Sequence, residues 1–303
     1  MTLASIQPFL ALRDMPQSID IATLRTRLEQ AGVEHTYTIA FTPRCGSTAL
    51  SNALTYAGVG RPAEYFQYPY DTQSPFGRTP SGDFSHDLEA LIRDQSANGI
   101  FGAKIMHDHR AHLDDWLESS VTGYTTLDDV LPNHRWIYVR REDSIAQAVS
   151  LYIADETGTW HMPAADADMP APDVRYDFLG ILAKLMMLHS HEANWDAYFR
   201  KTGIQPLRVS YEALSDASSQ LLDVVATHLE LPADRLAGVQ LTRTGGLNKI
   251  SDRFGDVYRT IRERFTDDFL AIGRRDNRAT YGADLDRWID FFGNRRWRGN
   301  EVR

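Results

Sequence analysis

The sequence has a single cysteine and no long apolar run, and each absence excludes a class of protein. Because Cys45 has no second cysteine to pair with, a disulfide framework is excluded, and a reducing compartment fits. The apolar runs are only a few residues long, whereas a transmembrane helix needs ~20 residues, so we expect no membrane span. The first residues also lack the basic stretch of a signal peptide. We therefore expect a cytoplasmic protein.

The chain also lacks an excess of basic residues. Its 303 residues include 32 Lys and Arg against 41 Asp and Glu, which gives a formal net charge of −9. A protein that coats nucleic acid needs a surplus of cations to contact phosphates, so we expect no nucleic-acid partner. Hydrophobic residues make up 43% and charged residues 24% of the sequence, a balance typical of a folded chain with a large core.

Strand-like and helix-like segments alternate along the chain. Apolar, β-branched stretches predict strands, and apolar residues at helical spacing predict helices between them. The strands are expected at 35–41, 100–106, 135–139 and 206–209, and the helices at 47–57, 87–94, 111–119, 143–154, 176–201, 217–229, 257–265 and 284–292. This alternation predicts an α/β fold, a parallel sheet flanked by helices. We expect one domain over 1–303, with a helical extension at 1–34 and a helical tail at 266–303.

A candidate phosphate-binding loop, TPRCGST, joins the first strand to the next helix. The free N–H groups and the positive dipole of a helix start favour an anion. Arg44 adds a guanidinium fork, and Ser47 and Thr48 add hydroxyl donors. The alternative is an ordinary turn in which Thr42 or Ser47 caps the helix. A cation, a glycine and two hydroxyls within five residues lead us to favour phosphate binding.

The residue pattern of this loop excludes three common anion-binding motifs. A nucleoside-triphosphate loop needs a lysine after its last glycine, but Ser47 follows Gly46 directly, and a dinucleotide fingerprint is also missing. A phosphatase-type cysteine loop needs an arginine six positions after Cys45, where Ser51 stands. A cysteine at a helix start is expected to have a lowered pKa. Because the arginine of a phosphatase-type loop is missing, we do not favour Cys45 as a nucleophile.

The segments TPRCGSTAL and AGVGRPAEYF resemble the carbohydrate sulfotransferases of the bacterial trehalose 2-sulfotransferase family, whose loop typically reads PRSGST. The resemblance implies a P-loop-kinase-like sulfotransferase fold, the sulfate donor 3′-phosphoadenosine-5′-phosphosulfate (PAPS) and no metal. It also implies that the donor's 5′-phosphosulfate is held by Arg44, Cys45, Gly46, Ser47 and Thr48.

A second anion site, for the donor's 3′-phosphate, is expected in RWIYVRREDSIAQAVSLY. Arg140 and Arg141 end a strand, and Ser150 follows about two turns into the next helix. This spacing resembles the 3′-phosphate motif of sulfotransferases, in which Arg141 is the better match. The alternative is that both arginines pair with Glu142 and Asp143 at a solvated helix start.

Two later segments also resemble the family. LTRTGGLNKISDRFGDVYR makes Arg243 a candidate for a further donor contact, although Phe254 stands where tryptophan is usual. LRVSYEAL resembles the family's strand before a helix, and we assign it a structural role only.

Sulfuryl transfer to a hydroxyl needs a general base. By resemblance that base is Glu64 in GRPAEYF, although a surface glutamate is the ordinary alternative. His107 is the rival base. Strand alternation places Lys104 and Met106 on one face and His107 on the other, so we expect Lys104 to contact sulfate and His107 to be secondary. The neighbours His107, Asp108 and His109 cannot easily converge on one metal ion.

We therefore expect a sulfotransferase that moves the sulfuryl group of PAPS to a hydroxyl of a sugar or glycolipid. The alternatives are a small-molecule kinase of related architecture and a non-catalytic nucleotide-binding protein. The partner is then a small-molecule or glycan acceptor, and because the resembled family includes dimers, a homodimer stays open. Rings that could cover a sugar face, if they do not simply pack in the protein, are Tyr65, Phe66, Tyr68, Tyr70 and Trp160.

Overall fold

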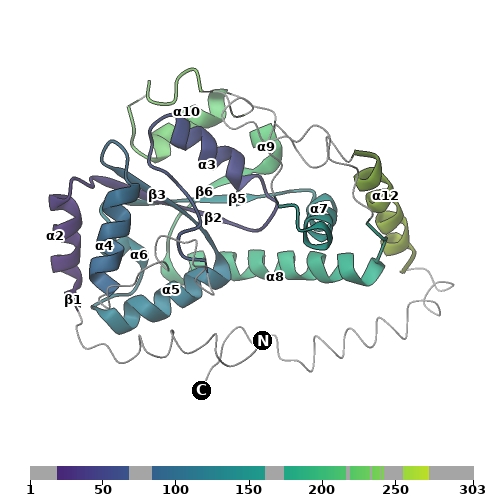
Figure 1. Ribbon diagram of the computed structural model, residues 1–303, viewed down its shortest axis with the longest axis horizontal. Helices are drawn as coiled ribbons and strands as arrows, with labels where there is room; N and C mark the ends of the chain where they lie inside the picture. Colours follow the sequence, from purple (N-terminus) through teal and green to yellow (C-terminus); the bar gives the residue numbers. More distant parts are fainter. Residues whose placement is uncertain are drawn as a thin grey trace.

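A four-stranded parallel sheet with the strand order β3-β2-β5-β6 forms the centre of the molecule (Figure 1). The computed structural model describes residues 19–67, 84–160, 174–215, 219–232, 234–239, 241 and 255–272. The strands are β2 (His35–Phe41), β3 (Ile100–Met106), β5 (His134–Arg140) and β6 (Leu207–Ser210). All four strand predictions are confirmed to within one residue at each end. Because the strands are parallel, their carboxyl ends meet at one edge, where ligands bind in such sheets.

Helices cover both faces of the sheet, as expected for parallel strands that are apolar on both sides. One face carries α3 (Ser47–Tyr56), α9 (Tyr211–Ser215) and α10 (Ser219–His228). The other carries α4 (Phe84–Gln95), α5 (His107–Ser120), α6 (Leu127–Val130) and α8 (Phe178–Thr202), with α2 (Ile21–Gln30) outside them. A third core joins α7 (Ser144–Thr157) and α12 (Gly255–Ile272) to α8.

Alternation along β5 sends neighbouring side chains into different cores. Trp136 and Tyr138 enter the α8 face, while Ile137 and Val139 enter the α3 face. On the α8 face, Trp195 packs 6.0 Å from the ring of Trp136. Burying side chains of this size contributes about 1.5–3 kcal/mol each, so α8 is held firmly against the sheet.

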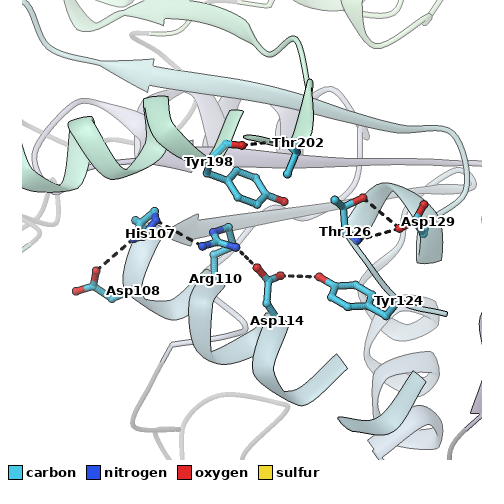
Figure 2. Close-up of polar contacts among 9 residues, drawn as sticks. All are labelled: His107, Asp108, Arg110, Asp114, Tyr124, Thr126, Asp129, Tyr198 and Thr202. Atoms are coloured by element: carbon cyan, nitrogen blue, oxygen red, sulfur yellow. Dashed lines mark hydrogen bonds and ion pairs between the residues drawn. The ribbon is translucent and has the colours of Figure 1, made fainter. Parts of the chain in front are cut away.

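Three short elements were not predicted from the sequence. The two-residue strands β1 (Ile19–Asp20) and β4 (Val121–Thr122) pair with each other, and α6 spans a single turn. The turn α6 is held by a capping box: Asp129 accepts from the Thr126 backbone N–H at 2.9 Å (Figure 2). Such elements are too short for periodicity to reveal. The predicted helix at 284–292 lies outside the described residues.

A buried arginine ties α5 to α8. Arg110 pairs with Asp114, which also accepts a 2.5 Å hydrogen bond from the Tyr124 hydroxyl, and the guanidinium lies 4.0 Å from the ring centre of Tyr198 (Figure 2). A buried charge needs such partners to offset its desolvation.

Among the helices that the structure describes, none has the length and apolar character needed to span a membrane.

Candidate active site

The predicted phosphate loop lies between β2 and α3 at the carboxyl edge of the sheet. Gly46 is the N-cap of α3 with φ 84°, and as a glycine it makes no side-chain hydrogen bond to the helix start. Thr42, the alternative cap, instead accepts a hydrogen bond from Gln147 Nε2 at 2.9 Å. Because the N-cap is a glycine, the cap residue itself offers no side-chain acceptor to the first N–H groups of α3, and a bound anion can take that place.

Arg44 joins the two predicted anion sites. Its Nε donates to Ser150 Oγ in α7 at 3.0 Å, and its Nη1 donates to the Trp160 backbone oxygen at 2.6 Å. The backbone of Arg44 has φ 66°, a left-handed conformation that is unusual for a residue with a Cβ. Burial, followed by the nearby charge of Arg141, lowers the pKa of Arg44. The structure thus brings Arg44, Ser150 and Arg141 together.

Arg140 and Arg141 leave β5 on opposite faces. Arg140 pairs with Glu192 of α8 at 2.9 Å and lies over the ring of Tyr138. Arg141 lies on the phosphate-loop side, with its guanidinium carbon 4.4 Å from the ring centre of Tyr211, and its buried Nε has no hydrogen-bond partner among the residues that the structure describes. Asp143, the alternative partner, caps α7 and pairs with Arg262.

Within the described part of the chain, neither Arg44 nor Arg141 is ion-paired with a carboxylate. Two neighbouring guanidinium groups without a counter-ion repel each other, which favours a bound anion. An open pocket of ≈ 560 Å³, within the range of small-ligand sites, lies at the carboxyl ends of β5 and β6. Its lining includes Arg141 and the Arg140–Glu192 pair but none of the phosphate-loop residues 42–48.

Lys104 connects Glu64 to the phosphate loop. Its Nζ lies 3.2 Å from Glu64 Oε1 and 3.3 Å from Thr48 Oγ1. The loop that carries Glu64 is fixed to β3 because Lys104 N donates to Ala63 O at 2.8 Å. Lys104 is buried, whereas the Glu64 side chain is 30% exposed and can meet a ligand. A carboxylate and an ammonium group thus lie beside the start of α3.

His107 lies apart from this arrangement, on the α8 side. It packs edge-on against Trp195 at 5.5 Å and contacts Asp108 (Figure 2), while Met106 packs on the α3 face. The predicted alternation of Lys104, Met106 and His107 is thus confirmed. His107 also begins α5 instead of ending a strand.

His109, considered in the sequence only as a metal ligand, also interacts with Glu64. Burial lowers the pKa of His109, and the charge of Glu64 raises it, so the two groups interact. Strand alternation would point His107 and His109 to the same side, away from Lys104. Because a helix begins at His107, His109 instead points away from His107, and an earlier predicted helix start would have made this visible. No group of three or more metal-ligating side chains occurs in the described segments.

Cys45 corrects one expectation. Burial raises the pKa of the Cys45 thiol to about 11, and hydrogen bonds from backbone N–H groups only partly offset this. The side chain is fully buried, so desolvation outweighs the helix start, and the predicted lowering of the pKa is wrong. Arg243 lies outside the described residues.

The chain is similar to proteins of one known family. The model of the Stf0 sulphotransferase family matches residues 36–260. A trehalose 2-sulfotransferase of Mycolicibacterium smegmatis is 30% identical over 227 residues, which are 64% of this chain and 82% of the relative. One of Mycobacterium tuberculosis is 27% identical over 260 residues, which are 74% of this chain and 94% of the relative. The chain therefore belongs to the Stf0 sulphotransferase family.

Proposed function

We propose that this sulfotransferase moves the sulfuryl group of PAPS to a hydroxyl of a sugar, with Glu64 as the general base. The observation that carries the proposal is the position of Lys104 between Glu64 and Thr48, at 3.2 Å and 3.3 Å. A base, a cation and a phosphate-loop hydroxyl thereby share one small region. Group transfer to a hydroxyl requires this combination.

The cations of the site fit a donor with two separated anionic groups. Arg44, Ser47, Thr48 and the N–H groups at the start of α3 would hold the phosphosulfate end. Arg141 and Ser150 would hold the 3′-phosphate. Arg141 is favoured over Arg140 because its buried Nε lacks a partner among the described residues, while Glu192 already neutralises Arg140. When bound, the donor supplies an activated sulfuryl group.

The residues around that group would then direct the transfer. Glu64 takes the proton of the acceptor hydroxyl. The hydroxyl oxygen bonds to sulfur as the bond from sulfur to the phosphate oxygen breaks. Lys104 and Arg44 stabilise the negative charge that develops on the transferred and leaving oxygens. Adenosine 3′,5′-bisphosphate leaves, and the protonated Glu64 returns its proton to water.

The two relatives support trehalose or a similar sugar as the acceptor. Of the rings considered for a sugar face, Tyr65 and Phe66 are buried in the core. Trp160 is 43% exposed and its backbone contacts Arg44, so it is the ring best placed among the described candidates. Tyr68 and Tyr70 lie outside the described residues.

The direct test is sulfate transfer from radiolabelled PAPS to trehalose, other disaccharides and a lipid-linked sugar. We expect a labelled product with at least one sugar and no dependence on Mg²⁺. Mg²⁺-dependent phosphoryl transfer from ATP would instead indicate a kinase. Binding of adenosine 3′,5′-bisphosphate without transfer to any acceptor would indicate a non-catalytic nucleotide-binding protein.

The two neighbouring arginines should respond differently to the same substitution. Arg141→Gln should weaken binding of adenosine 3′,5′-bisphosphate by about 10-fold or more, because a charge-assisted contact is lost. Arg140→Gln should leave this affinity within about twofold but lower Tm by a few degrees, because Glu192 loses its partner. Calorimetric titration and thermal unfolding separate the two effects. The reverse pattern would move the 3′-phosphate contact to Arg140.

A further inference from the structure

Tyr211 and Glu212 follow β6 directly and begin α9 at the carboxyl edge of the sheet. Both side chains reach turns that belong to other strands. The first is the Gly46 turn after β2, and the second is the 141–143 turn after β5. The proposed function places the two anionic ends of the donor at these two turns.

Tyr211 lies directly against the Gly46 turn. A Cβ added to Gly46 would lie 2.7 Å from Tyr211 Cδ2 and 3.4 Å from Cε2. The turn therefore packs directly against the ring, with no room for a side chain at residue 46. The same ring lies 4.4 Å from the guanidinium carbon of Arg141, so one side chain supports both turns.

Glu212 holds the second turn through its backbone. Its Oε2 accepts from Glu142 N at 3.1 Å, and its Oε1 accepts from Asp143 N at 3.4 Å. These bonds fix the chain immediately after Arg141. Together the adjacent side chains of Tyr211 and Glu212 contact both anion-binding turns.

We propose that Tyr211 and Glu212 form a brace that fixes the distance between the two anion-binding turns, an inference that rests on the proposed function. Arg44 and Arg141 repel each other, so a rigid support is needed to keep both aimed at one ligand. Without the brace each turn keeps its own cation, but the two turns lose their fixed spacing. A ligand that spans both turns then loses more affinity than a ligand that touches one.

The first test compares three nucleotides on one set of variants: 5′-AMP, 3′-AMP and adenosine 3′,5′-bisphosphate. For Tyr211→Leu we expect the affinity for adenosine 3′,5′-bisphosphate to fall about 10-fold or more. This factor should exceed the product of the factors by which the affinities for 5′-AMP and 3′-AMP fall. Glu212→Ala should show the same excess. Losses that simply multiply, or no loss, would overturn the brace.

Tyr211→Phe is the matched control because it keeps the ring and removes only the hydroxyl. We expect its affinity for all three nucleotides to stay within about twofold. A large loss in Tyr211→Phe would show that the hydroxyl itself binds the ligand, which contradicts a role through the turns.

A second measurement needs no nucleotide. Cys45 is the single cysteine of the chain, is fully buried, and precedes Gly46. A turn released from the Tyr211 ring should expose it, so Tyr211→Leu should increase the rate of Cys45 labelling by a thiol reagent about 10-fold or more. Tyr56→Leu, at an exposed tyrosine of α3, and Tyr211→Phe should label as the wild type does.

The two measurements separate the brace from the proposed function. If the wild type binds no adenosine 3′,5′-bisphosphate, the proposed donor is wrong, and the labelling rate alone decides on the brace. If the wild type binds it, but Tyr211→Leu keeps both wild-type affinity and slow labelling, the brace is wrong and the proposed donor stands. Circular dichroism and Tm confirm that each variant is folded before it is compared.

Discussion

Replacing Glu64 by glutamine is expected to lower kcat by about 10²–10⁴-fold while leaving the affinity for adenosine 3′,5′-bisphosphate within about twofold. The amide keeps the size and shape of the side chain but cannot accept the proton of the acceptor hydroxyl. Its contact with Lys104 changes from an ion pair to a hydrogen bond, so the site keeps its geometry. Sulfate transfer and calorimetric titration measure the two quantities.

Glu29→Gln is the matched control for this substitution. Glu29 is exposed on α2 and pairs with Arg25 at 3.4 Å, so the same chemical change there removes an ion pair far from the sheet edge. Its kcat should equal that of the wild type. If Glu64→Gln also turned over at the wild-type rate, Glu64 would not be the base, and His109 would be the next candidate because it interacts with the same carboxylate.

Lys104→Met is expected to lower kcat by about 10²–10³-fold, the usual effect of removing one group that stabilises charge in the transition state. Methionine fills the buried space but brings no charge to Thr48 and Glu64. Lys184→Met removes an ion pair with Asp155 between α7 and α8 and should leave kcat unchanged. A Lys104→Met enzyme with wild-type kcat would contradict a catalytic role for this ammonium group.

Combining Lys104→Met with Glu64→Gln shows how the lysine acts. If Lys104 stabilises charge on the sulfuryl group, it should still lower kcat in the Glu64→Gln background. If it acts only by holding the carboxylate, the double variant should turn over as Glu64→Gln alone does. We expect a further loss of about 10-fold or more, because Nζ also contacts Thr48 in the phosphate loop.

The sheet and the phosphate loop were predictable because their signals are local. The strand β2 is rich in β-branched and aromatic residues over seven consecutive positions, and a helix that follows a glycine turn can be recognised within about ten residues. Helix periodicity likewise placed α8 with an error of two residues at its start and one at its end.

The remaining features of the site depend on contacts distant in sequence. Whether Arg140 or Arg141 carries an available charge depends on Glu192, which is 52 residues away. Cys45 has a raised pKa because a whole core closes over it, which a local helix-start argument cannot capture. Tyr211 appeared structural because its contacts with Gly46 and Arg141 exist only after three strands are aligned. Spacing in a motif identifies candidates, and burial and pairing then distinguish among them.

The left-handed backbone of Arg44 lowers the free energy of unfolding but places its guanidinium in the site. A residue with a Cβ in that conformation costs roughly 1 kcal/mol relative to glycine. A library screened only for heat resistance would therefore favour glycine at this position and discard the guanidinium that reaches Ser150. Selection of thermostable variants of this enzyme should accordingly hold residue 44 fixed or score turnover together with melting temperature.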